Sequence, residues 1–544
     1  MEMKKIINFS VEFSISEAYI KKAISYIEKN ASFFLGIFLV ILALYSFDVF
    51  SRGGFSLAYN DARSHLDIGR RVVEGLKPGL AQLGSVWLPL PHVLMIPTIW
   101  LDFFWHSGLS GALVSMTSFI ITGILIYAFL NKLGVGIFGK ALGVLVYAAN
   151  LNVLYLTSTA MTELLLLATM TGGVYYLTTW YKDKKLIDLI KSAFFVMLST
   201  LVRYDGWFLL LAGAVIIGFN VISAKGYKEA EGKVILFLTL GSLGVFLWFL
   251  WNLLIFGDPL YFVFGPFSAQ AQQSQIYAAG ELFTKGNLYL SAKAYLYALF
   301  YNSYTLITIL GAYGAFIFWR DIKIKKDVKI STLLLLAPLA FNVLALYLGH
   351  SVLFVVGVMG DTWFNVRYGM MLIPSMAIFI GFLVDRLRQY RYLILSLFAM
   401  VTFFAFVNYD VVTIEDALIG ASGKNVTEVS GWLKKNVSDE EGFVLISVAS
   451  HDAIIFSSGL PMKKFIHEGT GDYWKLATGN PQKWARWIVM RTNDLTDMTF
   501  ADIRDTNWQD YYVLVNHYPF ADIYELKPEF VADVQTQPVL AKQR

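Results

Sequence analysis

The chain has 544 residues, of which 56% are hydrophobic and only 15% are charged, and it contains no cysteine. A soluble chain carries about 25% charged residues, so this composition excludes an ordinary soluble globular protein. The lack of cysteine excludes disulfides and thiolate metal sites. The formal net charge of +4 comes without a basic tract, so no nucleic-acid partner is indicated.

Repeated apolar runs of about 18 to 24 residues predict a polytopic α-helical membrane protein with about eleven transmembrane helices. A mixed-charge N-terminal segment covers residues 1–31, and the membrane domain covers 32–409 with a long first external loop at 51–108. The spans are expected at 32–50, 109–131, 137–157, 163–181, 187–203, 206–222, 233–256, 300–319, 330–349, 368–386 and 391–409.

The polar breaks between these spans set the orientation. Basic residues collect in the breaks that contain Lys132 and Lys140, Lys182 to Lys185, Lys225 and Lys228, Arg320 to Lys329, and Arg386 to Arg391. With a cytoplasmic N-terminus, all these breaks fall inside, as the positive-inside rule requires. This holds only if the apolar stretch 86–105 does not cross. Its three prolines, His92 and Asp102 argue against a straight helix in lipid, so we expect it at the outer interface, with a kinked span as the alternative.

From residue 410 to 544 the composition becomes that of a small soluble α/β domain. A strand-like segment at 443–449 lies between helix-like patterns at 424–436 and 451–457. The region has about 130 residues, which is long enough for a core of its own. An odd number of spans places this domain outside the cytoplasm, so the chain is expected in the cell membrane with an extracytoplasmic C-terminus.

The first external loop carries a dense group of ionisable residues at the point where the first span leaves the bilayer. Ionisable groups are costly near hydrocarbon, so a cluster there predicts a polar site. The adjacent Asn60 and Ala62 offer Asp61 no partner, and the loop around it is long, which favours a functional role. His65 lies one helical turn later on the same face, where it could orient Asp61 or join a metal. With no second histidine nearby in the sequence, metal binding is the weaker alternative.

Other polar residues at the span ends reach the same external level in this topology. They are Glu163, Arg203, Asp205, Asp258, His350, Asp361, Arg367 and Tyr368. Acids and arginines at one level predict a cavity that holds an anionic headgroup beside a carboxylate base. The structural alternatives are that Glu163 complements its helix dipole, that Arg203 pairs with Asp205, and that Arg367 anchors its helix at the interface.

These motifs, in this order, resemble the GT-C superfamily of membrane glycosyltransferases, especially the group of protein O-mannosyltransferases and lipid A aminoarabinose transferases. The resemblance covers about residues 30–410 and rests on NDARSHL, WLPLPHVL, YLTSTAMTELLLL, LVRYDGW, WNLLIFGDPLYF and NVRYGMMLIP. It implies a polyprenyl-phosphate-linked sugar as donor, work on the external face, and a first-loop acid as catalytic base, which by position is Asp61.

The sequence also departs from this group. Relatives often carry a paired Asp-Glu in the first loop, whereas this chain has Asn60-Asp61, so Glu163 becomes the candidate for the second acid. The WWD-type signature of oligosaccharyltransferase catalytic subunits is absent, which argues against transfer of a whole oligosaccharide to asparagine.

The expected activity is transfer of a sugar from a polyprenyl-phosphate donor to a hydroxyl of a protein, lipid or glycan. Asp61 would be the general base, and Arg203 and Arg367 would stabilise the leaving phosphate. His65, Asp205 and Tyr368 are expected around the substrate. No certain cofactor is indicated, and a divalent metal stays open.

Two other classes of protein are weighed against this expectation. A transporter or lipid flippase would place its charges near the bilayer midplane and often shows a repeated half, and neither is visible here. A non-catalytic receptor or assembly protein would work through its external domain.

Overall fold

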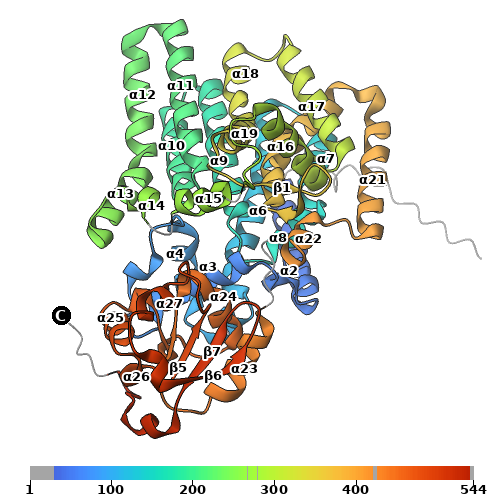
Figure 1. Cartoon of the computed structure of the whole chain (residues 1–544). Coiled ribbons are helices and arrows are strands. Elements are labelled where there is room, and N and C mark those ends of the chain that lie inside the picture. The colour runs from blue at the N-terminus through green and yellow to red at the C-terminus, as the bar shows by residue number, and fades with distance from the viewer. Residues whose placement is uncertain (1–29, 266–267, 279, 421–425, 539–544) are drawn as a thin grey trace, which may run out of the picture.

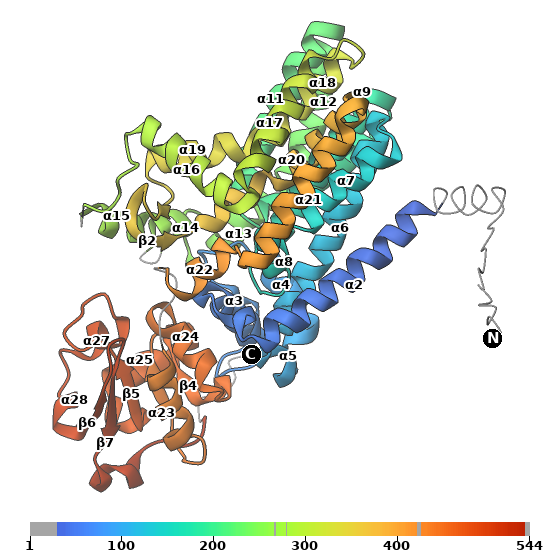
Figure 2. The same cartoon turned by 90° about the vertical axis from the view of Figure 1, so that its right-hand side faces the viewer.

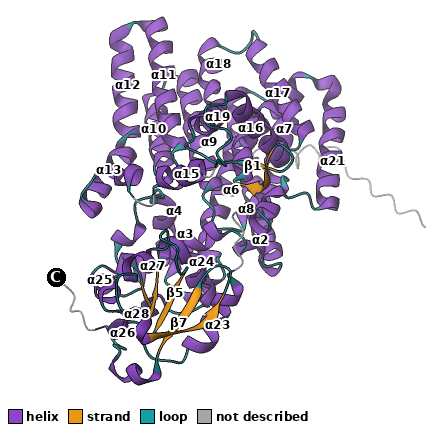
Figure 3. Ribbon diagram, in the orientation of Figure 1, coloured by secondary structure: helices purple, strands orange, loops and turns teal. Residues whose placement is uncertain are grey.

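The apolar runs form a bundle of helices, and the C-terminal region forms a sheet with helices packed on it (Figures 1 and 3). The computed structural model describes residues 30–265, 268–278, 280–420 and 426–538. The predicted cytoplasmic segment 1–31 therefore lies, up to residue 29, outside the described residues.

The bundle differs from the predicted spans mainly in where its helices break. Its helices are α2 (Ala31–Arg52), α6 (Leu109–Leu133), α7 (Ile137–Ala148), α8 (Leu151–Thr157), α9 (Glu163–Asp183), α10 (Leu186–Thr200), α11 (Asp205–Lys225), α12 (Tyr227–Gly241), α13 (Leu243–Phe256), α16 (Leu288–Ser303), α17 (Thr305–Arg320), α18 (Lys326–Thr332), α19 (Ala337–Leu348), α20 (Ile373–Arg386) and α21 (Arg391–Asn408). In the described part of the chain, six helical segments are long and apolar enough to cross a membrane, or up to eight if each bent pair is one span. The count of about eleven stays a prediction.

Two of the predicted spans contain breaks that hydropathy does not detect. The span expected at 137–157 is divided into α7 and α8, which meet at 63°, because Asn150 caps α8 by accepting a hydrogen bond from the backbone N–H of Val153. The span expected at 300–319 is divided at Tyr304, whose φ of 64° lies in the left-handed region and separates α16 from α17.

The apolar stretch 86–105 consists of two short helices, α4 (Leu90–Ile99) and α5 (Asp102–His106), with Pro97 inside α4. Ten residues of helix rise about 15 Å, roughly half the thickness of a hydrocarbon core. Helix α4 packs along the loop helix α3 (Asn60–Val73), where Arg70 donates to the carbonyl oxygen of Ile99 at 2.9 Å. The stretch therefore belongs to the first loop in its packing as well as in its sequence.

The outer surface of the bundle is apolar. Large hydrophobic side chains are exposed on α2, α11, α13 and α21, among them Ile41, Phe219, Leu254 and Phe403. A soluble protein rarely exposes so much contiguous apolar surface, so these faces have the character expected of contact with lipid.

Ion pairs bring the predicted inside breaks together at one end of the bundle. Lys132 pairs with Asp183 at 2.5 Å, and Lys184 pairs with Asp327 at 2.8 Å. Helix α9 begins at Glu163 and ends at Asp183, and its 21 residues span about 30 Å. The basic end of the bundle and Glu163 are therefore about one hydrocarbon thickness apart.

The C-terminal region contains a five-stranded mixed sheet in the order β4-β3-β5-β7-β6 (Figure 3). Its strands are β3 (Val444–Ile446), β4 (Phe465–Ile466), β5 (Trp487–Met490), β6 (Tyr512–His517) and β7 (Asp522–Leu526). Strand β3 is parallel to β4 and β5, and β7 is antiparallel to β5 and β6. The strand predicted at 443–449 ends earlier than expected, at Ile446, because α24 (Val448–Ser458) begins two residues later.

The C-terminal sheet and its helices dock on the first external loop, with α24 beside α3 (Figure 2). Arg71 of α3 pairs with Asp452 of α24 at 3.3 Å. Gln82 donates a 2.8 Å hydrogen bond to the carbonyl oxygen of Gly469. Helix α3 thus lies between the bundle and the C-terminal region, in contact with both.

Single cysteines test the orientation, since the chain has none of its own. Asp439→Cys, on an exposed position of the C-terminal region, should react with an impermeant maleimide on intact cells. Lys326→Cys, exposed at the basic end, should react only after the cells are opened, because that end is expected inside. The cysteine-free wild-type chain is the control, and labelling of both positions from the same side would contradict the topology.

Candidate active site

Five segments bring polar side chains together at the end of the bundle that faces the C-terminal region. Three of them are the start of α3, the start of α9 and the turn between α10 and α11. The other two are the 3-10 helix η4 (Val366–Leu372) and the short helix α22 (Val412–Leu418). These segments are far apart in the sequence, so the site exists only in the folded chain.

Glycines in two of the sequence motifs allow the close packing that positions the arginines. A Cβ on Gly206, three residues after Arg203, would lie 2.3 Å from the backbone of α10. A Cβ on Gly369, two residues after Arg367, would lie 2.2 Å from the backbone of α16. Neither position has room for a side chain, so glycine is required in VRYDGW and in NVRYG.

Arg367 is the centre of the site and contacts three carboxylates from three segments. Its Nη2 donates to Oδ2 of Asp61 at 2.6 Å, and its Nε donates to Oε1 of Glu163 at 3.0 Å. Its Nη1 lies 3.6 Å from Oδ2 of Asp416. The Arg367 side chain is only 4% exposed, so its charge is neutralised by these neighbours and hardly by solvent.

Arg203 extends the cluster toward the surface. Its Nη1 lies 3.2 Å from Oε1 of Glu163, and its Nε lies 3.3 Å from Oδ2 of Asp205. Its guanidinium carbon lies 4.6 Å from the ring centroid of Tyr368, and that of Arg367 lies 5.4 Å from the same ring. One oxygen of Glu163 is therefore shared by both arginines, and Tyr368 lies against both cations.

Of the three structural alternatives considered from the sequence, two describe contacts that exist within this cluster and one does not apply. Glu163 is the first residue of α9, where it also complements the helix dipole. Arg203 does pair with Asp205, and it contacts Glu163 as well. Arg367 is buried among carboxylates, whereas an interfacial anchor would be exposed to water and lipid headgroups. The anchor alternative therefore does not apply to Arg367.

The cluster holds four carboxylates and two guanidinium groups, and several of its polar atoms lack a hydrogen-bond partner among the described residues. These atoms are Oε2 of Glu163, Oδ1 of Asp205, Oδ1 of Asp416 and Nη1 of Arg367. Buried polar groups are normally satisfied, so such atoms mark places where a bound molecule or water would add contacts. Asp61 is the most open of the four acids, with 36% of its side chain exposed.

Sequence reasoning missed Asp416 and Tyr59, which complete the site. The Tyr59 hydroxyl donates to Oδ2 of Asp416 at 3.0 Å, and its ring lies 4.9 Å from the guanidinium carbon of Arg367. Burial and the Asp416 carboxylate raise the pKa of Tyr59 well above its usual value, so this hydroxyl keeps its proton. Asp416 follows the last predicted span and was assigned to the soluble domain, so no sequence signal placed it at this level.

The hydrogen-bond partner of His65 is not Asp61, which the sequence suggested as one alternative. Nδ1 of His65 lies 2.8 Å from Nε2 of His92, and the His65 ring lies 4.3 Å from that of Trp87. No hydrogen bond joins it to Asp61 among the described contacts. Burial, together with the charges of Arg367 and Arg203, lowers the pKa of His65 to about 3, so the ring is neutral at pH 7. It lines the arginine cluster as an uncharged group and does not orient Asp61.

A second histidine, His92, therefore does lie beside His65, although the two are 27 residues apart in the sequence. Two histidine nitrogens still do not make a metal site. Among the residues that the structure describes, no three His, Cys, Asp or Glu side chains are grouped closely enough to hold a metal ion. The geometry of the described residues thus supplies no set of ligands for a divalent metal, and metal dependence stays an open question of the sequence analysis.

Three polar residues expected at the same level lie away from the cluster. His350 and Asp361 are exposed, and within the described part of the chain neither side chain forms an ion pair or hydrogen bond with the cluster. Oδ1 of Asp258 accepts a hydrogen bond from the backbone N–H of Leu260 at 2.8 Å, which closes a turn after α13. Asp258 is thus a turn residue.

Comparison with known proteins gives a likeness of fold. No protein-family model matches, and no curated protein matches. The chain is similar to the crystal structure of ArnT from Cupriavidus metallidurans bound to undecaprenyl phosphate, with a TM-score of 0.56, 11% identity, and coverage of 92% of this chain and 99% of ArnT. The apo structure of ArnT gives a TM-score of 0.55 at 12% identity and the same coverage.

A further similar structure is the archaeal oligosaccharyltransferase AglB from Archaeoglobus fulgidus, in complex with an inhibitory peptide and a dolichol-phosphate. It matches with a TM-score of 0.46 at 8% identity, covering 85% of this chain and 70% of AglB. ArnT is a lipid A aminoarabinose transferase, one of the group that the sequence motifs resemble. The likeness to ArnT, at 11–12% identity, is a likeness of fold.

Removing Arg367 should destabilise the protein, because Asp61, Glu163 and Asp416 would then be left without their shared cation. We expect Arg367→Ala to lower the free energy of unfolding by about 3–5 kcal/mol, the usual effect of breaking a buried ion pair. Thermal unfolding of the purified protein in detergent measures it. Arg388→Ala is the matched control, since the Arg388 side chain is 79% exposed. Equal melting of the two variants would contradict the central position of Arg367.

Proposed function

We propose that this protein is a membrane glycosyltransferase that moves a sugar from a polyprenyl-phosphate-linked donor to an acceptor hydroxyl on the external face. The observation that carries the proposal is the cluster of two arginines and four carboxylates at the end of the bundle opposite its basic breaks. The likeness to ArnT, which was solved with undecaprenyl phosphate, supports the choice of a polyprenyl-phosphate donor.

The transfer reaction requires a base for the acceptor. The acceptor oxygen attacks the anomeric carbon, the bond from that carbon to the phosphate oxygen breaks, and the polyprenyl phosphate leaves with the electron pair. The hydroxyl proton passes to a carboxylate, and we assign this role to Asp61 because it is the one partly exposed acid of the cluster. A single displacement of this kind inverts the anomeric centre. Glu163 is buried beneath both arginines and would position them.

Arg203 and Arg367 are assigned to the phosphate. Arg203, at 19% exposed, would meet the phosphate first, and the phosphate would then compete with Asp61 for Nη2 of Arg367. Glu163 and Asp416 would continue to hold Arg367 during this exchange. The exchange would release the Asp61 carboxylate to accept the hydroxyl proton, while the arginines stabilise the charge that develops on the leaving phosphate.

An aromatic cluster beside Arg203 is suited to the start of the polyprenyl tail. Tyr204 follows Arg203 directly, and its ring stacks on Phe262 with a centroid distance of 5.9 Å. Trp207 and Phe249 pack on the same ring at 5.7 and 5.5 Å. Large apolar side chains on α13 next to this cluster are exposed, so a hydrocarbon chain would find apolar surface from the headgroup into the bilayer.

The proposal also covers the orientation of the chain in the membrane, the C-terminal domain and the acceptor. The N-terminus would be cytoplasmic, and residues 410–544 would form an extracytoplasmic α/β domain that bounds the acceptor side of the site through its contact with α3. The acceptor is assigned only by its chemistry, a hydroxyl of a protein, lipid or glycan. His65, Asp205 and Tyr368 would line the donor.

The proposal is tested by incubating the purified protein with a panel of polyprenyl-phosphate sugars and measuring release of polyprenyl phosphate. Release that depends on an added acceptor extract supports it. Movement of labelled lipid across vesicles without release of polyprenyl phosphate would favour a flippase instead.

Replacing Asp61 by Asn keeps its shape and removes the proton acceptor. Transfer should fall by about 10² or more, as expected for loss of a general base, while donor binding persists because both arginines remain. Asp48→Asn is the control, since Asp48 is an exposed acid at the end of α2 that forms an i,i+4 ion pair with Arg52. A folded Asp61→Asn protein with near wild-type transfer would move the base to Glu163.

The phosphate assignment is tested by Arg203→Lys and Arg367→Lys. Lysine keeps the charge but loses the forked donor geometry that Arg offers to a phosphate, so donor affinity should fall about tenfold at either position. Equilibrium binding of a labelled polyprenyl-phosphate sugar measures the effect. Unchanged affinity in both variants, with normal unfolding, would make the arginines structural.

A further inference from the structure

A charged hollow lies between the first external loop and the C-terminal region, and none of its lining residues belongs to the arginine cluster. Its volume is about 480 Å³, and it is lined by Leu57, Arg63, His106, Lys434, Phe456 and Ser457. The lining comes from the 3-10 helix η1 (Phe55–Leu57), α3, α5, α23 (Thr427–Val437) and α24. The hollow is therefore built from both parts of the chain.

The lining carries positive charge and no carboxylate. Arg63 is half-buried, and its hydrogen bonds go to neutral acceptors, the carbonyl oxygen of Leu57 at 2.8 Å and Oγ of Ser457 at 3.3 Å. No ion pair is formed by Arg63 or Lys434 within the described part of the chain. Burial lowers the pKa of Arg63, because withdrawing a cation from water is unfavourable. A cation held in this way without a carboxylate favours an anionic ligand.

The acids nearest to His106 do not neutralise the hollow. Asp102 and Glu74 both pair with Arg70, whose guanidinium also lies over the ring of Trp105. The His106 ring packs against Trp105 and Phe456, with centroid distances of 4.1 and 6.1 Å. The hollow thus combines cationic donors with aromatic walls.

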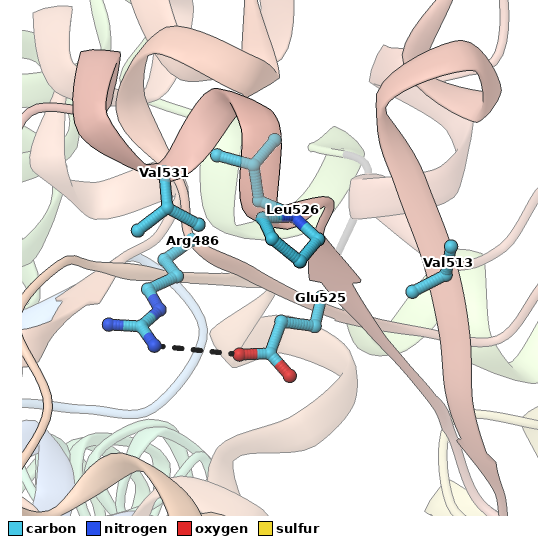
Figure 4. A pocket seen from close by; sticks show the side chains of 6 residues that line it. Arg486, Val513, Glu525, Leu526 and Val531 are labelled. Carbon is cyan, nitrogen blue, oxygen red and sulfur yellow. Dashed lines mark ion pairs between the residues drawn. The ribbon is translucent and has the colours of Figure 1, made fainter.

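The charge of this hollow is clearer when it is compared with another one on the C-terminal sheet. That hollow has a volume of about 400 Å³ and contains Arg486 (Figure 4). Arg486 lies 2.8 Å from Glu440 and 3.7 Å from Glu525, so its charge is already neutralised. Of these two hollows, the one around Arg63 is lined by cations that form no ion pair with another described residue.

The position of the Arg63 hollow is at the expected membrane surface. Leu57 follows the end of the apolar helix α2, and α5 carries the exposed ring of Phe103 one turn before His106. Trp100, just before α5, is exposed as well, and such rings are typical of the interface between lipid and water. A ligand in this hollow would have its charged end at the level of lipid headgroups.

We infer that the hollow around Arg63, His106 and Lys434 binds the phosphate group of an anionic membrane lipid. The phosphate would contact Arg63 and Lys434, Ser457 and the neutral His106 ring would donate hydrogen bonds, and the acyl chains would leave past Phe103 into the bilayer. A lipid bound there would connect α3 and α5 with α23 and α24. The hollow shares no lining residue with the proposed donor site, so this inference does not depend on the proposed function.

The test measures binding of dioctanoyl phosphatidylglycerol to the purified full-length protein in uncharged detergent. Binding is followed through the increase in the temperature at which the protein unfolds. Arg63→Gln and Lys434→Gln should each weaken binding about tenfold, the loss expected for one charge-assisted hydrogen bond. Lys435→Gln, the exposed neighbour outside the hollow, should leave binding unchanged. Dioctanoylglycerol, which has the same chains without the phosphate, should not stabilise the protein.

The outcomes separate the sources of the phosphate. Equal stabilisation by inorganic phosphate at the same concentration would overturn the lipid assignment in favour of a soluble phosphate ligand. Equal affinity of phosphatidylglycerol for the wild type, both hollow variants and Lys435→Gln would overturn the site itself. If Arg63→Gln does not fold, Lys434→Gln decides the question, because Lys434 is exposed on a surface helix. Transfer activity is not needed for any of these readouts.

Discussion

The contact of Arg367 with three carboxylates is the interaction on which the site depends. Asp61 is 306 residues away in the sequence, Glu163 is 204 residues away, and Asp416 lies beyond the next helix pair. A buried cation or carboxylate alone is strongly unfavourable, so none of these segments can settle in place without the others. The first external loop, the start of α9 and the short helix α22 are therefore fixed relative to one another by charge, and Asp61 is held at a defined place beside the arginines.

This arrangement also explains how a site that recognises a phosphate can exist in a largely apolar protein. The arginines are neutralised by carboxylates when no ligand is bound, and Asp61 is the only one of these partners with substantial exposure. A phosphate can replace it without leaving Arg367 unpaired, because Glu163 and Asp416 stay in contact. Exchange of one anion for another costs less than uncovering a buried charge.

The sequence predicted which residues form this cluster better than it predicted where the surrounding helices break. Glu163, Arg203 and Arg367 were placed together only because a consistent topology put them at one membrane level, and the structure brings all three into contact. Asp416 could not be found in this way, since it lies after the last span in a segment that reads as soluble. The breaks at Asn150 and Tyr304 were missed because hydropathy averages over a window and does not register one cap or one left-handed residue.

His65 shows a different limit of reasoning from periodicity. Its spacing from Asp61 was interpreted correctly as one helical turn, but the side of α3 that carries His65 is covered by α4, which supplies His92. The partner of a side chain depends on which helix packs over it, and a single helix contains no information about that. The same applies to the hollow around Arg63, whose walls come from both ends of the chain.

The most direct test of the account is a structure of the full-length protein in nanodiscs with bound undecaprenyl phosphate. We expect phosphate oxygens within hydrogen-bond distance of Arg203 and Arg367. We also expect the prenyl chain to start along Tyr204 and Phe262, and Asp61 to have separated from Nη2 of Arg367. A lipid phosphate bound elsewhere, with Asp61, Glu163 and Asp416 still holding Arg367 as they do now, would contradict it.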